Sequence, residues 1–184
     1  MHNISVIREI KPNKSCFKRT VVTIGFWALG RALQSLSHFD KKVIEDIKDW
    51  PENFKISLNV LPLGPYLSIV KKNGKLKLNG VSSKENPTEK FQNADLIVDV
   101  KNIDTAFRMI IAQWGVHDVY AQHKTSVIGN VVDAMKFIRI IYAAEDFLFP
   151  PILSKNILKR LRKTSFSKFS NRMRVYFLGL FFGI

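Results

Sequence analysis

The sequence predicts an α/β (α+β) fold with five short strands and several helices. Three observations lead to this prediction. Short segments alternate apolar and polar residues, which is the period of a β-strand. Longer segments repeat apolar residues every three or four positions, which is the period of an α-helix. Asn73-Gly74 joins two of the strand segments and is typical of a tight β-hairpin turn.

The first element is expected to be a helix over residues 20–36, followed by a second, short helix. Ser37 is expected to cap the second helix, which contains Val43, Ile44 and Ile47. Pro51 is expected to end this helical region. The apolar residues at helical spacing in the first helix are Val22, Phe26, Leu29, Leu33 and Leu36.

Three strands are expected between residues 54 and 78. Residues 54–60 alternate strictly between apolar and polar side chains, which predicts a strand with one face toward water. Gly64-Pro65 breaks this segment, and a second strand is expected over residues 66–72. The Asn73-Gly74 turn then leads into a third strand over residues 75–78.

A loop, a fourth strand and another helix are expected next. Residues 82–93 are polar and include Pro87, which predicts the loop. Residues 95–100 resume the alternation of a strand. Asn102 is a suitable N-cap for a helix with one apolar stripe. That stripe consists of Ile103, Ala106, Phe107, Ile110, Ile111 and Trp114.

The last predicted elements are an irregular piece through Tyr120, a fifth strand over residues 124–128 and a long helix. Asn130 is expected to cap this helix, which runs from residue 131 to about 149 and stops at Pro150-Pro151. Apolar residues cover most of its circumference. Such a helix must be buried on more than one side, or must cover something apolar.

The charge of the chain is concentrated at its two ends. The formal net charge is +14, yet residues 32–150 hold 15 basic against 14 acidic residues. Basic ends on a neutral body are typical of docking to an anionic membrane or to nucleic acid. We expect membrane docking, because no helix-turn-helix, RNP-like strand or KH loop accompanies the charges. The expected docking residues are Lys155, Lys159, Arg160, Arg162, Lys163, Phe166, Phe169, Arg172, Arg174, Tyr176 and Phe177.

The sequence also favours an intracellular protein at the inner face of a membrane. No apolar run reaches the roughly 18 residues that a spanning helix needs. The basic N-terminus followed by an apolar run has the outline of a signal peptide, but Arg31 follows at once and the helical pattern continues, so we expect no cleavage. Cys16 is the only cysteine, which excludes an internal disulfide and suits a reducing compartment.

Four segments resemble the sterol carrier protein 2 domain, a small lipid-binding module. They are IVKKNGKLKLNG (69–80), ADLIVDV leading into NIDTAFRMIIAQ (94–113), VYAQHKTSVIGN (119–130) and VVDAMKFI (131–138). Ala94-Asp95 matches the family pattern ADxxIxx, and Ala121, Val127 and Gly129 match AxxxGKLxxxG loosely. The step at residues 123–125 departs from the usual Gly-Lys-Leu, and the basic tail lies outside the usual module.

This resemblance implies a five-stranded, mostly antiparallel sheet with helices packed on one face, and an apolar tunnel for a fatty acyl chain, a sterol or an isoprenoid quinone. It implies no catalytic residue and no cofactor. The tunnel residues that it implies are Phe107, Ile110, Ile111, Trp114, Tyr120, Met135, Ile138 and Tyr142. For each of them an ordinary place in the core is the competing interpretation.

Three other patterns are interpreted as structural. Gly25 and Gly30 superficially resemble a phosphate loop, but the lysine and hydroxyl residue are absent, so we expect an apolar helix. His117 and His123 lack further ligands at a metal-binding spacing. Asp95 and Asp99 share one face of a strand, which a solvated face explains.

The sequence thus predicts a basic N-terminal segment with an apolar helix (1–36), a lipid-binding domain (37–150) and a basic aromatic tail (151–184). We expect a non-enzymatic carrier of an apolar lipid, with a protein of a lipid pathway as a further partner. A nucleic-acid-binding adaptor and a small lipid-modifying enzyme are the alternatives.

Overall fold

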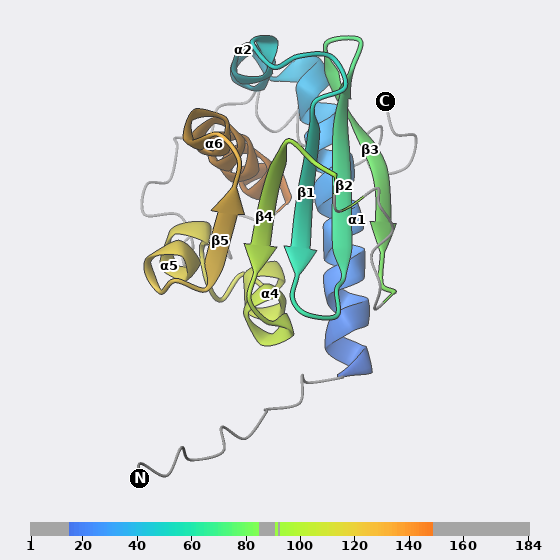
Figure 1. Ribbon diagram of the computed structural model, residues 1–184, viewed down its shortest axis with the longest axis vertical. Helices are drawn as coiled ribbons and strands as arrows, with labels where there is room; N and C mark the ends of the chain where they lie inside the picture. Colours follow the sequence, from blue (N-terminus) through green and yellow to red (C-terminus); the bar gives the residue numbers. More distant parts are fainter. Residues whose placement is uncertain (1–14, 85–90, 92, 149–184) are drawn as a thin grey trace, which may run out of the picture.

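A five-stranded sheet forms one layer of the protein (Figure 1). The computed structural model describes residues 15–84, 91 and 93–148. The strands lie in the order β3-β2-β1-β4-β5, and only β1 and β4 run parallel, which confirms a mostly antiparallel sheet. The strands are β1 (Lys55–Val60), β2 (Tyr66–Lys72), β3 (Lys75–Ser82), β4 (Leu96–Val100) and β5 (Thr125–Ile128).

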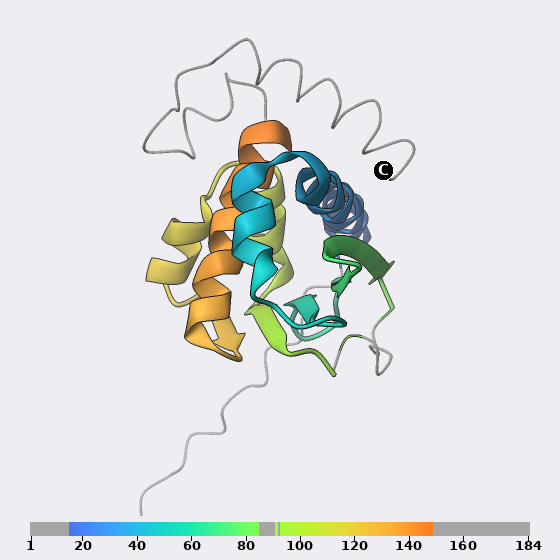
Figure 2. The same cartoon turned by 90° about the horizontal axis from the view of Figure 1, so that it is seen from above.

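Helices form the second layer. Figure 2 shows α1, α2 and α6 on the same side of the sheet, which confirms the predicted packing on one face. Among the described residues, no helix is both long enough and apolar enough to cross a membrane. The helices are α1 (Cys16–Phe39), α2 (Lys41–Lys48), α4 (Ile103–Ile110), α5 (Val116–Ala121) and α6 (Val131–Leu148).

Helix α1 belongs to the same packed core as the sheet. It contacts β2, β3, α4 and α6, and its residues Val22, Leu33 and Leu36 are at most 1% exposed. Burying side chains of this size stabilises a fold by about 1.5–3 kcal/mol each. The predicted division between residues 36 and 37 falls inside this helix, so the apolar helix and the sheet domain share one core.

The prediction that Ser37 caps the second helix is wrong. Helix α1 continues through Ser37 to Phe39, and Asp40 caps α2 by accepting hydrogen bonds from the backbone amides of Lys42 (2.8 Å) and Val43 (3.4 Å). The Ser37 hydroxyl instead accepts a hydrogen bond from the Leu76 amide of β3 at 3.1 Å. A contact between distant segments therefore overrides the local preference of serine for a helix end.

The polar face of β1 is buried, contrary to the prediction of a face toward water. Ser57 is 0% exposed and Asn59 is 9% exposed. Ser57 donates to the Asn59 side-chain oxygen at 2.7 Å, and the Asn59 amide donates to Asp99 of β4 at 2.9 Å. The alternation of residues therefore predicted correctly which side chains share a face of β1. The polar side chains, however, form a buried hydrogen-bonded network and do not face water.

Two further elements differ in length from their predictions, and a third differs in type. Strand β3 runs four residues beyond the predicted end, to Ser82, because it pairs with β2 as far as Tyr66. Helix α4 ends at Ile110 rather than Trp114, since Ala112 adopts a φ of 62° that a helix does not tolerate. The predicted irregular piece through Tyr120 is helix α5, whose Asp118 carboxylate accepts from the Gly115 amide at 3.3 Å.

Replacing Lys71 should test how α2 is held against the sheet. Lys71 is 5% exposed, and its ammonium donates hydrogen bonds to the carbonyls of Lys48 and Trp50 at the end of α2. We expect Lys71→Met to lower the free energy of unfolding by about 1–3 kcal/mol, because two carbonyls lose their charged donor. Urea denaturation measures this change. Lys72→Met, at the adjacent exposed position, is the matched control. Equal losses of unfolding free energy in both variants would show that the Lys71 ammonium does not hold α2 against the sheet.

Candidate ligand-binding cavity

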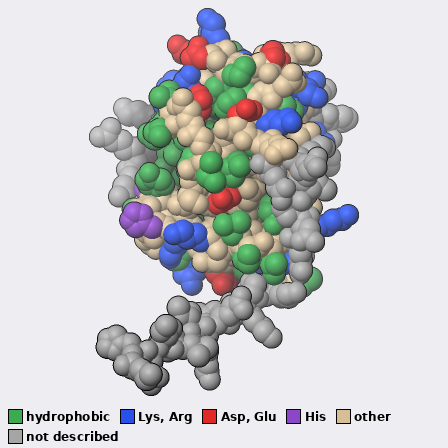
Figure 3. Space-filling model, viewed as in Figure 1, with side chains coloured by type: hydrophobic (Ala, Val, Ile, Leu, Met, Phe, Trp, Pro, Cys, Tyr) green, Lys and Arg blue, Asp and Glu red, His purple; other side chains and the backbone are tan. Residues whose placement is uncertain are grey.

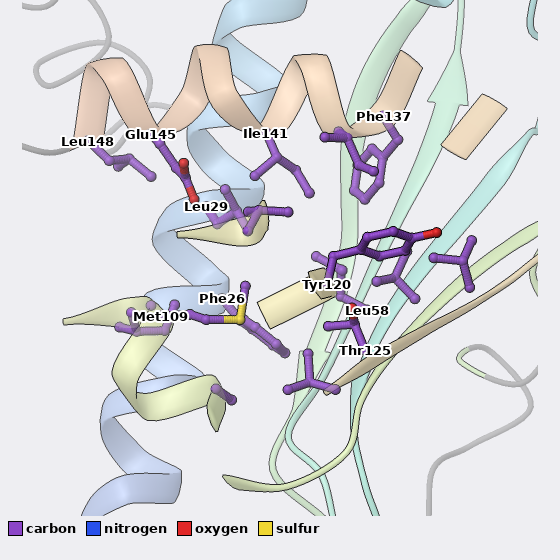
Figure 4. A pocket seen from close by; sticks show the side chains of 18 of the residues that line it. Phe26, Leu29, Leu58, Met109, Tyr120, Thr125, Phe137, Ile141, Glu145 and Leu148 are labelled. Carbon is purple, nitrogen blue, oxygen red and sulfur yellow. The ribbon is translucent and has the colours of Figure 1, made fainter. Parts of the chain in front are cut away.

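A cavity of about 270 Å³ lies between the helix-covered face of the sheet and helices α1, α4, α5 and α6 (Figure 4). Its sheet side includes a row of side chains from three adjacent strands. Leu58 of β1 pairs in register with Val98 of β4, which pairs with Val127 of β5. Because paired residues point to the same face of a sheet, these three side chains form a continuous apolar floor.

Small residues on the helices leave the space open. Gly25 and Ala28 of α1, Ala106 of α4 and Ala134 of α6 all line the cavity. Their side chains are too short to reach across the gap, so the surrounding large residues cannot close it. Gly25 also brings α1 close to α4, because a Cβ added there would lie 2.6 Å from the Ile110 side chain.

Helix α6 follows the cavity along most of its length. The lining residues Ala134, Ile138, Ile141, Glu145 and Leu148 recur every three or four positions, so they share one side of the helix. This stretch of helix spans roughly 21 Å at 1.5 Å per residue. The cavity is therefore elongated along α6.

Among the described residues of the wall, Glu145 is the only acidic or basic one, and Tyr120 and Thr125 supply the other polar side-chain oxygens. Figure 4 shows Glu145 extending from α6 beside Leu29. Its Oε2 atom is buried and has no hydrogen-bond partner. Burial raises the pKa of the Glu145 carboxyl to about 7, so a large fraction of it is protonated near neutral pH.

Three of the eight predicted tunnel residues lie on the cavity wall. Ile110 reaches it from α4, Tyr120 from α5 and Ile138 from α6. The structure brings these three together from separate segments of the chain. Their role in binding a ligand remains a prediction. The other five, Phe107, Ile111, Trp114, Met135 and Tyr142, are absent from the wall.

Those five residues have other surroundings. The Phe107 ring lies 6.2 Å from the Phe17 ring of α1. Trp114 lies beyond the end of α4, with the Lys124 ammonium 3.6 Å from its ring centroid. The Tyr142 hydroxyl shares a hydrogen bond of 2.7 Å with Nδ1 of His117, which joins α6 to α5. Ile111 lies just past the last residue of α4 and is 37% exposed.

Met135 belongs to an exposed apolar patch beside the cavity. Figure 3 shows hydrophobic side chains gathered on the side of the molecule where β5 and the start of α6 lie. Tyr120 lines the cavity, although its side chain is 60% exposed. The cavity wall thus reaches the surface at Tyr120. The patch consists of Ile128, Val131, Val132 and Met135, all more than half exposed.

Sequence reasoning missed the contribution of α1 and the role of Glu145. Phe26 and Leu29 line the cavity from a helix that the sequence analysis assigned to a separate segment. The sequence analysis did not single out Glu145, which falls four residues after Ile141 and three before Leu148 on the apolar side of α6. A charged residue inside an apolar stripe was the available signal.

The patterns that the sequence analysis interpreted as structural have structural partners. Gly25 and Gly30 lie within helix α1, as expected. Asp95 is exposed, as expected, and its carboxylate accepts a hydrogen bond from the Lys55 amide at 2.7 Å, which joins the ends of two strands. Within residues 15–84, 91 and 93–148, no three His, Cys, Asp or Glu side chains gather in a way that suits a metal ion. The predicted docking residues between 155 and 177 lie outside the described residues.

Solved structures similar to this chain carry the name of the family that the sequence resembles. The UbiJ-SCP2 ubiquinone synthesis protein matches at 15% identity and a TM-score of 0.42, over 69% of this chain and 98% of its own. The sterol carrier protein domain 2 of Helicoverpa armigera matches at 18% identity and a TM-score of 0.41, over 74% of this chain and 94% of its own. Sterol carrier protein 2 of Yarrowia lipolytica matches at 23% identity and a TM-score of 0.40, over 65% of this chain and 88% of its own. No protein-family model and no curated protein matches the chain.

Replacing Glu145 with glutamine should stabilise the protein at alkaline pH. The pKa of this carboxyl is about 7 in the fold against an ordinary 4.5, so between these values the folded chain keeps a proton that the unfolded chain loses. The free energy of unfolding therefore falls as the pH rises through this window and stays lower above it. Glu145→Gln removes this loss, and we expect a gain on the order of 1–3 kcal/mol at pH 8 and little change at pH 4.5.

Urea denaturation at several pH values measures the effect of Glu145→Gln. Glu45→Gln, an exposed position on α2, is the control and should leave the pH profile unchanged. A Glu145→Gln profile parallel to that of the wild type would show that this carboxyl is not buried as described.

Proposed function

We propose that this chain binds one apolar lipid in the cavity and carries it without chemical change. The observation that supports this most strongly is the cavity itself, whose floor and walls are made almost entirely of apolar side chains. Apolar cavities of about 150 Å³ stay dry and admit a guest as large as benzene. A cavity of about 270 Å³ that extends along α6 suits a longer apolar body.

Transfer out of water supplies the affinity. Each methylene that leaves water contributes roughly 0.8 kcal/mol, so a long alkyl or isoprenoid chain binds tightly without any polar contact. Because Tyr120 both lines the cavity and is 60% exposed, we place the entry for lipid beside it.

A carrier fits the side chains of the wall better than an enzyme does. Catalysis on a lipid needs a nucleophile or a general base within reach of the bound molecule. His117 is hydrogen-bonded to Tyr142, and neither residue lines the cavity. His123 is exposed. Among the described residues of the wall, no Ser, Cys or His side chain accompanies Glu145.

Filling the cavity from the sheet should abolish lipid binding. Val127 of β5 points into the cavity, so Val127→Trp places a large ring where the guest would lie. We expect the affinity for the uncharged fluorescent probe diphenylhexatriene to fall at least tenfold. The added ring displaces the probe from apolar contacts that are equivalent to the burial of about two methylene groups. Fluorescence titration measures the affinity, and circular dichroism checks that the variant is folded.

The neighbouring residue provides a matched control for this test. Ile128 is 59% exposed and points to the opposite face of β5, so Ile128→Trp adds the same ring outside the cavity. It should bind the probe like the wild type. Equal affinities for all three proteins would place the probe elsewhere and remove the support for a carrier.

We further propose that the carrier docks on the anionic inner face of a membrane through its basic ends, from the cytoplasmic side. The support is the charge distribution, in which residues 151–184 hold eight basic and no acidic residues, interleaved with aromatic ones. Each Lys or Arg near an anionic surface contributes about 1 kcal/mol. The exposed apolar patch beside the cavity entry suits contact with the same surface.

Neutralising four charges of the tail should release the full chain from anionic vesicles. We expect the variant in which Lys159, Arg160, Arg162 and Lys163 become Gln to bind phosphatidylserine-containing vesicles at least 100-fold more weakly, as measured by co-sedimentation. Replacing the exposed Lys41, Lys42, Lys72 and Lys75 is the charge-matched control. Retention on RNA or DNA at salt concentrations that abolish vesicle binding would favour a nucleic-acid adaptor instead.

A further inference from the structure

The polar chemistry of the cavity is concentrated in one side chain near one end. Figure 4 shows Glu145 and Leu148 at one end of the pocket and Tyr120 toward the other. The Oε2 atom of Glu145 is buried without a hydrogen-bond partner, and the neighbouring wall residues from α1 and α4 are uncharged. A buried carboxyl oxygen left unpaired destabilises a protein by several kcal/mol unless a guest supplies the missing bond.

The head of a bound lipid is the group best placed to supply that bond. A hydroxyl suits both states of a carboxyl, because it accepts from the acid and donates to the anion. A carbonyl accepts from the acid. An uncharged head therefore satisfies Glu145 without bringing a second charge into the apolar cavity.

Charged heads meet this carboxyl less well. A fatty-acid carboxylate would place a second negative group beside Glu145 in an environment of low dielectric, where like charges repel strongly. An alkylammonium head would pair with one of its three donors and leave the other two without acceptors, since few other polar atoms line the cavity.

We propose that Glu145 is a specificity-determining residue of the lipid site, which hydrogen-bonds an uncharged lipid head and rejects fatty-acid anions. This inference rests on the proposed lipid-binding function and adds the class of head group to it. The apolar body of the ligand then lies along α6 toward Tyr120, with its head at the Glu145 end.

A set of ligands with one body and different heads tests the proposal. Decane, 1-decanol, decanoate and decylamine compete with diphenylhexatriene for the full chain at pH 8, and their affinities are compared between the wild type, Glu145→Gln and Glu145→Leu. Glu45→Gln and Glu45→Leu are the controls, because they make the same changes at an exposed position of α2 outside the cavity wall.

We expect 1-decanol to bind five- to tenfold more weakly to Glu145→Leu than to the wild type, because one buried hydrogen bond is lost. In Glu145→Gln, 1-decanol should keep its affinity within about twofold, since the amide also donates and accepts. Decanoate should bind Glu145→Gln at least tenfold more tightly than the wild type, because the like charge is gone. Decane should bind all variants alike, and the two Glu45 variants should bind the whole series like the wild type.

The outcomes separate this inference from the proposed function. If decane and 1-decanol bind but neither 1-decanol nor decanoate responds to the Glu145 variants, the cavity binds lipid and Glu145 does not select the head. Decylamine binding that exceeds that of 1-decanol and is lost in Glu145→Gln would also overturn the proposal, since the site would then select cations. If no member of the series displaces the probe, the lipid-binding function itself fails.

Discussion

The packing of α1 against the sheet and against helices α2, α4 and α6 is the interaction on which the rest of the structure depends. This helix of 24 residues contacts β2 and β3 on one side and α4 and α6 on others. Leu33 lies in the core, whereas Gly25, two turns earlier, lines the cavity and permits close approach to Ile110. The position of α1 therefore sets the shape of the core and the width of the cavity together.

The cavity stands in contrast to the dense core around it. Protein interiors normally leave few voids, because unfilled space forfeits dispersion contacts. Here short side chains such as Ala106 and Ala134 face the space while Phe137 is fully buried beside it. Glu145 adds a second unfavourable feature, a buried carboxyl oxygen without a hydrogen-bond partner. A guest that fills the space and bonds the carboxyl relieves both, and binding to the folded state alone stabilises the fold.

Most of the elements follow from local patterns in the sequence. The hairpin of β2 and β3 was predicted at Asn73-Gly74, and β1, β4, β5 and α6 lie within a residue or two of their predicted bounds. The errors share a physical cause. Ser37 lost its expected role to a hydrogen bond with Leu76, thirty-nine positions away, and the polar face of β1 is buried by contacts that alternation does not encode.

The sequence by itself determined the order of the elements, the mostly antiparallel sheet and the nearly all-apolar surface of α6, because periodicity and turn chemistry act over a few residues. Only the tertiary structure decided which apolar side chains line a cavity and which fill the core. That choice depends on the distances between α1, α4, α6 and the sheet, which join segments far apart in the chain. Tyr120 and Ile138 came together on the wall, whereas Met135, three residues before Ile138 on the same helix, faces solvent.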